Sequence, residues 1–296
     1  MLSSSKRSTF VIVACFFMLF TIFTLSTRYA AADDGMWMPH QMKELNLSTQ
    51  GLEMNPGDLY KEDGTGIMNA VVRVGMGGTG AFVSRDGLIL TNHHVAFSAI
   101  QRASDKDHDY IAQGFLAQTR DQEIPAQGYQ IWVLLGYEDV TEKVLAQLKP
   151  YRTPMARYKA LDRLEKKLTS EVENQGQDIS GDFKPMYNGN KYYLFKHKRL
   201  WDVRIVYAPP QSIGNFGGET DNWMWPRHTG DLTFIRAYVS KNNQGIPNSP
   251  DNVPYHPTSF LKTSIDSIKE GDFTFSMGYP STTRRSYTFS EFLEEM

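Results

Sequence analysis

The sequence predicts a mainly β chain with helical insertions, and three observations support this fold class. Runs rich in Val, Ile and aromatic residues, typical of strands, precede residue 95 and return after Trp201. Asp86-Gly87 separates two of these runs, which is a strong signal for a β-hairpin. Within 97–200, apolar residues recur every three or four positions, as on one face of a helix. We therefore expect strands in both flanks and a mixed, mainly helical middle.

The front of the chain predicts three strands before the middle stretch. The expected strands are 70–74, 80–84 and 88–91. The turn at Asp86-Gly87 joins the last two into a hairpin. Thr91 to His94 therefore lies at the exit of a hairpin strand.

The middle and the end of the chain predict helices and then further strands. Asp139 and Glu142 have capping-box spacing, and Thr153-Pro154 has the residues of a helix start. We interpret the helix that follows as a structural amphipathic helix packed on its neighbour. The later expected elements are strands at 203–207, 232–239 and 273–278 and a helix that begins within 289–296.

Composition and charge exclude several classes of protein. The 296 residues are 41% hydrophobic, a fraction too high for a disordered chain, and a single Cys excludes a disulfide scaffold. The formal net charge of −2 gives no sign of a nucleic-acid binder. We therefore expect one or two globular domains with no nucleic-acid partner.

Residues 1–32 have the features of a secretory signal peptide. Lys6 and Arg7 precede an uncharged apolar run over 8–27, and Ala30-Ala31-Ala32 offers a cleavage site. An uncleaved membrane anchor is the alternative, because such a run is just long enough to span a bilayer. Cleavage leaves 28 basic and 33 acidic residues, a charge of −5, and removes the only Cys. We expect an exported protein, periplasmic, cell-surface or secreted, with no membrane contact after cleavage.

Gly75 to Gly80 matches the dinucleotide fingerprint G-x-G-x-x-G. That fingerprint requires a helix directly after it, whose N-terminus binds the pyrophosphate. Here an expected strand and a hairpin turn follow instead. We interpret these glycines as a tight bend between strands and expect no nucleotide cofactor.

His94 and Asp231 form the candidate pair for acid–base chemistry. A hydroxyl nucleophile needs a rigidly held imidazole as base, and a carboxylate on the other ring nitrogen to fix its tautomer. His94 follows a hairpin strand, and Asp231 opens an apolar strand, where an unpaired carboxylate would be unfavourable. Taken singly, a core histidine and a turn aspartate are the simpler interpretations. Together, the order His then Asp favours the trypsin-like arrangement, in which the serine comes last.

Two long motifs make the resemblance specific. Gly80 to Val95 resembles the His-bearing hairpin of trypsin-like serine peptidases. Thr91-Asn92-His93-His94, together with the segment from Asp221 to Asp231, resembles the bacterial dipeptidyl-peptidase 7 and 11 family. Gly35-Met36-Trp37 and Met277 to Pro280 fit the same family, so the resemblance spans residues 33–296.

The resemblance implies a fold, an activity and site residues. Members of that family are serine exopeptidases that remove dipeptides from free peptide N-termini. They have a chymotrypsin-like double β-barrel with an inserted helical domain and tend to be homodimers. The base falls on His94, with His93 only its neighbour, and the carboxylate on Asp231. Recognition of the substrate amine falls on Asn222 and Trp223, since an amide oxygen and an indole face suit an ammonium group.

The resemblance also implies a domain plan and an incomplete site. Residues 33–288 correspond to the N-terminal part of the trypsin-like domain, with a helical insertion near 97–200, and 289–296 to the start of the helical domain. No serine has the Gly-flanked setting of a nucleophile; Ser276 and Ser281 come nearest. We therefore expect a fragment that is inactive alone, with its nucleophile beyond residue 296.

Two other functions remain open from the residues. One is a non-catalytic module or pseudoenzyme that binds peptide N-termini through Asn222 and Trp223. The other is a metal site built from His93, His94, His228 and Asp231. Adjacent histidines on a strand point to opposite faces, so we expect no metal and no other cofactor.

Overall fold

The computed structural model describes residues 36–61, 65–75, 77–222, 224–280, 288–290 and 293, with 221 and 222 described by their backbone alone. The chain divides into two compact units, Met1–Met38 and Pro39–Met296, and every element named below lies in the second. The expected signal peptide lies outside the described residues. No helix within the described ranges combines the length and apolarity needed to cross a bilayer.

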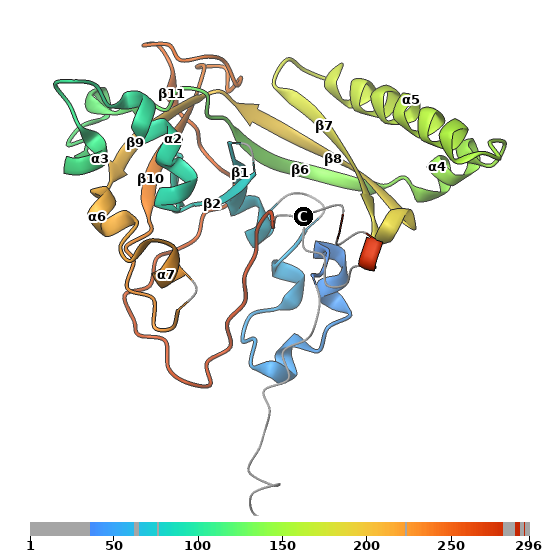
Figure 1. The fold of residues 1–296 in the computed structure, drawn as a ribbon, viewed down its shortest axis with the longest axis horizontal. Coiled ribbons are helices and arrows are strands. Elements are labelled where there is room, and N and C mark those ends of the chain that lie inside the picture. Colours follow the sequence, from blue (N-terminus) through green and yellow to red (C-terminus); the bar gives the residue numbers. More distant parts are fainter. Residues whose placement is uncertain are drawn as a thin grey trace, which may run out of the picture. The chain divides into compact units, whose positions relative to one another are not determined.

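An antiparallel sheet organises the second unit (Figure 1), which confirms the mainly β prediction. Its order is β4-β9-β10-β3-β2-β1-β6-β8-β7, while β5 pairs with β9 and β11 with β10. The strands are β1 (Val71–Val74), β2 (Gly78–Phe82), β3 (Leu88–Thr91), β4 (Phe115–Leu116), β5 (Ile124–Pro125), β6 (Ile131–Asp139), β7 (Ile179–Met186), β8 (Lys191–Leu200), β9 (Asp202–Ala208), β10 (Thr233–Val239) and β11 (Val253–Pro254).

Helices connect and cover these strands. The α-helices are α2 (His93–Ala103), α3 (Tyr110–Gln113), α4 (Thr141–Leu148), α5 (Pro154–Glu173), α6 (Gln211–Gly214) and α7 (Gly218–Asn222). The 3₁₀ helices are η1 (Pro39–Lys43), η2 (Leu47–Gln50), η3 (Pro56–Asp58), η4 (Ile67–Ala70), η5 (Arg120–Gln122) and η6 (Tyr187–Gly189).

Two tight turns hold the first three strands together. Gly75, at φ +58°, follows β1, and Val74 pairs with Gly78 across this bend, which confirms that the glycine-rich run is a turn between strands. Gly87, at φ +69°, lies in the β2–β3 turn, where the Val83 amide donates to the carbonyl of Leu88 at 2.8 Å. Positive φ is a conformation that glycine adopts without strain. The predicted hairpin is therefore confirmed.

The main core lies where α2 packs on the sheet. Ala96, Ala99 and Ile100 form the buried face of α2 and belong to one apolar cluster with strand residues. The strand side chains of this cluster that are fully buried are Val72, Phe82, Ile89, Ile131, Leu200, Ile235 and Ala237. Small residues on α2 bring the helix close to the strands, so the start of α2 is held by packing as well as by its connection to β3.

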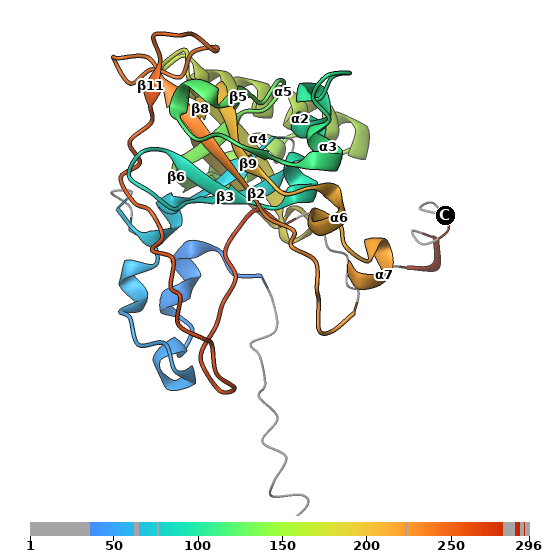
Figure 2. The same ribbon diagram turned by 90° about the vertical axis from the view of Figure 1, so that its left-hand side faces the viewer.

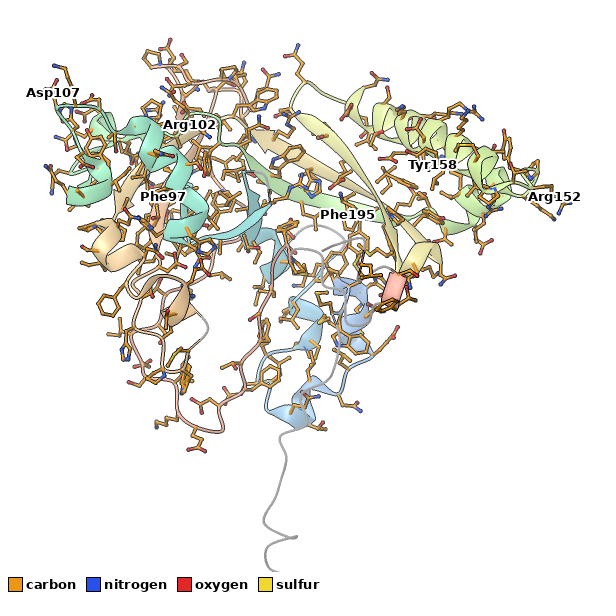
Figure 3. All side chains as sticks on the ribbon, viewed as in Figure 1. Phe97, Arg102, Asp107, Arg152, Tyr158 and Phe195 are labelled. Carbon is orange, nitrogen blue, oxygen red and sulfur yellow. The ribbon has the colours of Figure 1, made fainter. Side chains whose placement is uncertain are left out.

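The expectation of a mainly helical middle was wrong for part of the stretch. Helices α4 and α5 are present, and the Thr153 hydroxyl caps α5 by accepting from the Ala156 amide at 3.3 Å. However, β6, β7 and β8 lie within or across the same stretch and pair along their length. Figure 1 shows α5 lying along β7 and β8, and we call β6, β7, β8, α4 and α5 together the arm. Figure 3 shows Arg152 at the far end of this arm and Tyr158 further back, on α5.

Both faces of the arm are covered, which explains why its strands lack a clean alternation of apolar and polar residues. One face packs on α4 and α5 through Val144, Leu168 and Phe183. Aromatic contacts cover the other: the rings of Tyr137 and Phe195 are 5.4 Å apart, and the Tyr137 hydroxyl lies 2.9 Å from the Nδ1 of His40.

The expected strand at 273–278 was also wrong, since this segment pairs with no strand. Phe273 is half-buried against a small cluster formed by Leu47, Leu52 and Leu59, whereas Phe275 is exposed. Of the helix expected within 289–296, residues 289, 290 and 293 are described, and they are helical.

Candidate active site

The pairing of β3 with β10 brings His94 and Asp231 together across 137 positions of sequence. Thr91, the last residue of β3, is the partner of Thr233, the first residue of β10. His94 lies three residues after Thr91 and Asp231 two residues before Thr233. In an antiparallel pair these two positions are at the same end of the ladder. The sheet register therefore positions both residues of the predicted pair.

The carboxylate of Asp231 acts as the cap of α2. The first amides of a helix have no partner within the helix, and its N-terminus favours negative charge. Asn92 is the N-cap residue by position, but its side chain makes no cap bond and donates instead to the Asp231 carbonyl at 3.1 Å. The His94 amide donates to Oδ1 of Asp231 at 3.0 Å. The Asp231 carboxylate thus caps the N-terminus of α2 and fixes the backbone position of His94, the second residue of that helix.

The ring of His94 is bound by the same carboxylate. Its Nδ1 lies 2.7 Å from Oδ2 of Asp231. An ionised carboxylate only accepts hydrogen bonds, so Nδ1 carries the proton and Nε2 is left as an acceptor. The His94 side chain is 68% exposed, whereas that of Asp231 is 6% exposed. A buried carboxylate therefore orients a solvent-facing imidazole.

Several groups keep Asp231 ionised. Its burial alone would raise its pKa, but the hydrogen bonds from His94 and the charges of His94 and Arg227 together lower it. Arg227 donates from a terminal nitrogen to Oδ2 at 3.2 Å, and the side-chain amide of Asn92 lies 3.3 Å from the same oxygen. Arg227 and Asn92 lie within the sequence motifs, but the sequence assigned neither residue a role. Their signal was spacing: Arg227 lies four residues before Asp231, and Asn92 two residues before His94.

The loop that carries Asp231 is fastened to α6 and the residues after it. The Thr229 hydroxyl donates to the carbonyl of Phe216 at 2.7 Å, and the Gly230 amide donates to the carbonyl of Ile213 at 3.0 Å. Figure 2 shows α6 beside α3 and near α7. These bonds define the path of the loop immediately before Asp231.

His93 differs sharply from its neighbour, because it is buried. Its side chain is packed against Gly214 at the end of α6 and against Phe97, with 5.9 Å between the two ring centres (Figure 3 labels Phe97 on α2). Burial lowers its pKa, so the ring is neutral. Its Nε2 has no hydrogen-bond partner among the described residues. The two histidines lie on a helix and not, as we expected, on a strand.

The two residues predicted to bind the substrate amine, Asn222 and Trp223, are described only in part. Asn222 ends α7, but its side chain, like all of Trp223, lies outside what is described. Trp225 is 91% exposed, so this aromatic residue does not pack in the core. Within the described ranges, no group of three or more His, Cys, Asp or Glu side chains is arranged to hold a metal ion.

The serine candidates fall outside this geometry. Ser276 is exposed on the unpaired segment, and Ser281 lies outside the described residues. For the part of the chain that is described, the hydrogen bonds of the His94 side chain are those to Asp231, and no serine hydroxyl is bonded to its ring. The described part of the candidate site therefore contains an imidazole and its carboxylate partner.

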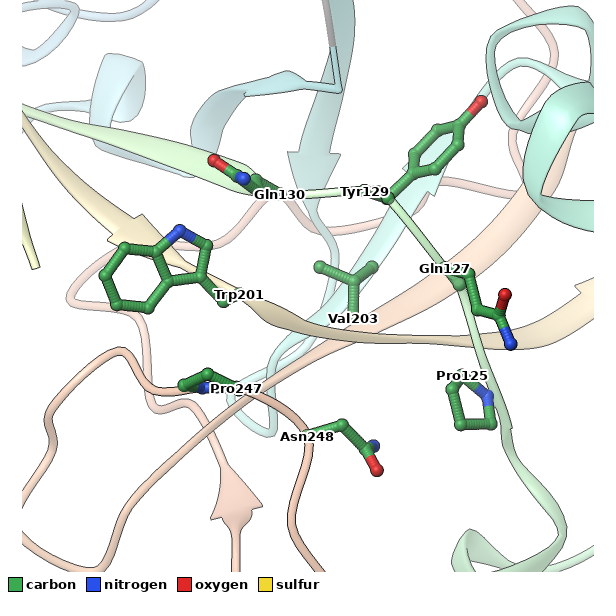
Figure 4. A pocket seen from close by; sticks show the side chains of 10 residues that line it. Pro125, Gln127, Tyr129, Gln130, Trp201, Val203, Pro247 and Asn248 are labelled. Atoms are coloured by element: carbon green, nitrogen blue, oxygen red, sulfur yellow. The ribbon is translucent and has the colours of Figure 1, made fainter.

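Two cavities lie away from this pair. One of about 490 Å³ lies beside β9 (Figure 4) and is lined by Pro125, Ala126, Gln127, Gly128, Tyr129, Gln130, Trp201, Val203, Pro247 and Asn248. Another, of about 480 Å³, includes Lys61 and Lys262. Active sites usually occupy the most prominent pocket. Here the hydrogen-bond geometry identifies the site and the cavities do not, since neither is lined by His94 or Asp231.

Comparisons with known proteins match this chain over nearly its whole length. The sequence profile of the family described as Peptidase S46 matches residues 32–296. A dipeptidyl-peptidase 7 of Porphyromonas endodontalis is 39% identical over 262 residues, covering 88% of this chain and 32% of that protein. An Asp/Glu-specific dipeptidyl-peptidase of Porphyromonas gingivalis is 40% identical over 280 residues, covering 92% of this chain and 39% of that protein.

Solved structures of a related protein have the same fold over this region. The crystal structure of Porphyromonas endodontalis DPP11 in complex with substrate matches with a TM-score of 0.80 and 37% identity, over 88% of this chain and 39% of that one. The structure of the same protein in complex with the dipeptide Arg-Asp matches with a TM-score of 0.76. The chain thus spans between 32% and 39% of the length of these relatives.

Proposed function

Because this chain belongs to the Peptidase S46 family, we propose that it supplies the general base and the orienting carboxylate of a serine-type dipeptidyl-peptidase. The proposed reaction releases dipeptides from peptides with a free N-terminus. His94 is the base and Asp231 the carboxylate. The sheet of this chain is then the N-terminal part of a trypsin-like catalytic domain, in an exported protein whose leader is residues 1–32.

One observation carries the proposal. The buried carboxylate of Asp231 lies 2.7 Å from Nδ1 of a ring that is 68% exposed. This leaves Nε2 ready to take the proton of a serine hydroxyl as that hydroxyl attacks a peptide carbonyl. The imidazolium that forms is stabilised by Asp231 and then donates its proton to the leaving amine. His94 then activates a water molecule in the same way. This water attacks the acyl-enzyme, frees the serine and releases the dipeptide.

The nucleophile is assigned outside the described residues. The relatives are considerably longer than this chain, which leaves room in such proteins for a serine and an oxyanion hole. We propose that the 296-residue chain is inactive alone. We further propose that Asn222 and Trp223 bind the substrate ammonium, because they precede the Asp231 loop in the chain and offer an amide oxygen and an indole face.

Hydrolysis of dipeptidyl chromogenic substrates tests the proposal. We expect no turnover by the 296-residue chain and turnover by a form extended to the length of the relatives. In the extended form, His94→Ala should lower kcat about 10³-fold or more. His108→Ala is the matched control, since His108 also binds an aspartate, Asp105, at 3.2 Å, but both side chains are 60% exposed. N-acetylated substrate should not be cleaved.

Three results would contradict the proposal. Full activity of the extended His94→Ala variant would remove the base from the mechanism. Turnover by the 296-residue chain that depends on His94 would place the nucleophile within it, at Ser276 or Ser281. Binding of free N-termini with no turnover in the extended form would indicate the non-catalytic module.

A further inference from the structure

Arg227 is placed to control the strength of the His94 base. It lies in the loop that precedes β10, and its guanidinium donates to Oδ2 of Asp231 at 3.2 Å. The same oxygen accepts from Nδ1 of His94 at 2.7 Å. A cation and a base that becomes cationic therefore share one carboxylate oxygen.

We propose that Arg227 is a positioning residue that holds the Asp231 carboxylate and restrains the protonation of His94. Its consequence for catalysis depends on the proposed function, in which His94 is the base. The proposal rests on the shared oxygen and on the burial of Asp231, whose side chain is 6% exposed.

The electrostatic effect follows from the distances. Two groups that contact one oxygen at 2.7 and 3.2 Å lie within about 6 Å of each other. A fixed positive charge at that separation opposes the charge that the ring gains when it takes a proton. Arg227 also donates to the oxygen that stabilises the imidazolium, and so weakens that stabilisation. Without its charge, the ring should hold its proton up to a higher pH.

The charged groups that act on the Asp231 carboxylate come from two elements. His94 belongs to α2, and Arg227 belongs to the loop before β10. Burial lowers the pKa of His93, so that ring adds no charge in the neutral range. Among the described residues, Arg227 is therefore the cation that faces the pair.

The geometry separates this role from simple packing. The Arg227 side chain is 38% exposed, and it contacts Asp231 through a terminal nitrogen. A lysine reaches a single acceptor with the same charge, whereas glutamine reaches it without charge. Arg227→Lys and Arg227→Gln therefore form a matched pair that differ in charge at one position.

Titration of the His94 ring by NMR, in the 296-residue chain, tests the inference without any enzymatic activity. His94→Gln assigns the signal. We expect Arg227→Gln to move the titration midpoint upward by about half to one pH unit. Arg227→Lys should leave it within about 0.3 unit of the wild-type value. In an extended, active form, the acidic limb of the kcat/KM profile should move in the same direction, with KM unchanged.

Two results would overturn the inference. An unmoved midpoint in Arg227→Gln, or equal movement in both variants, would show that the charge has no such effect. Loss of the folded spectrum in both variants would make Arg227 a residue required for folding. The titration needs no substrate, so these outcomes would not contradict the proposed function. Conversely, an extended enzyme without activity would contradict the proposed function but not the titration result.

Discussion

The carboxylate of Asp231 accepts two hydrogen bonds from His94, one from its amide at 3.0 Å and one from its ring at 2.7 Å. The first bond caps α2 and the second orients the base. A single buried side chain therefore links the position of the helix to the tautomer of its second residue. Removing the charge of Asp231 should affect both.

Asp231→Asn should nearly abolish peptidase activity in an extended form of the protein. An amide can present an N–H to the ring, which reverses the tautomer and leaves Nε2 protonated. We expect kcat to fall about 10⁴-fold, as carboxylate-to-amide changes do at such sites. The measurement is the steady-state hydrolysis of a dipeptidyl chromogenic substrate. Asp105→Asn, in the exposed pair with His108, should keep wild-type activity, and an equal loss there would argue against a specific role for Asp231.

Gly214→Ala should destabilise the protein through His93. A methyl group at Gly214 would lie 2.4 Å from Cγ and 2.6 Å from Cδ2 of the buried His93 ring. Neither α6 nor the ring can move freely, so we expect a loss of about 1–3 kcal/mol in the free energy of unfolding. Urea denaturation measures it. Gly77→Ala is the control, because a methyl group there has no described neighbour within 4 Å; a comparable loss in both variants would contradict the steric explanation.

His197 should make folding sensitive to mild acid. Burial, together with the charge of Arg73, lowers its pKa from the ordinary value of 6.5 to about 4. Between these two pH values the unfolded chain binds a proton that the folded chain does not, so stability falls as pH falls from 6.5 to about 4. The contribution over that window is about 3 kcal/mol.

His197→Phe should remove this pH dependence. Neither ring nitrogen of His197 has a hydrogen-bond partner among the described residues, so an apolar ring should be tolerated. Urea denaturation at pH 7.5, 5.5 and 4.5 compares the slopes. Phe195→Leu disturbs the same stacked rings, 6.3 Å apart, without a titrating group, and should lower stability equally at each pH. An unchanged slope in His197→Phe would show that other groups cause the acid sensitivity.

Thr153→Ala should weaken the start of α5. The Thr153 hydroxyl accepts from the Ala156 amide at 3.3 Å, and loss of such a cap lowers stability by about 1 kcal/mol. Thr119 precedes η5 in the corresponding position but makes no side-chain cap bond. Thr119→Ala should therefore change the free energy of unfolding by less than about 0.5 kcal/mol. Equal effects of the two substitutions in urea denaturation would rule out capping as the cause.

The parts of the fold that the sequence predicts well are those with strong local signals. Asp86-Gly87 indicates a turn by its chemistry alone, and Thr153-Pro154 indicates a helix start. The strands of the arm were missed because both their faces are covered, which removes the alternation of apolar and polar residues. The segment that contains Phe273 was expected to be a strand because a short apolar run does not show what it packs against. In the structure, Phe273 packs against the cluster formed by Leu47, Leu52 and Leu59.

The candidate pair could be named before the structure because its motifs resemble those of a known family, but its surroundings could not. That Asn92 binds the Asp231 carbonyl and not the helix that it precedes depends on a partner 139 residues away. The hydrogen bond from Arg227 to Oδ2 of Asp231 could not be predicted without knowing the path of the loop that carries both residues. Such contacts follow from the register of β3 on β10, which no local pattern encodes.

The pairing of Thr91 with Thr233 has a consequence for engineering. Thr91 and Thr233 are held together by the pairing of β3 with β10, so the chain between these two residues is a long connection whose ends are fixed in space. Lengthening a loop that is already long adds little entropic penalty to folding. The far end of the arm, at the exposed Arg152 between α4 and α5, is therefore a suitable place to insert a reporter domain while the distance between His94 and Asp231 is preserved.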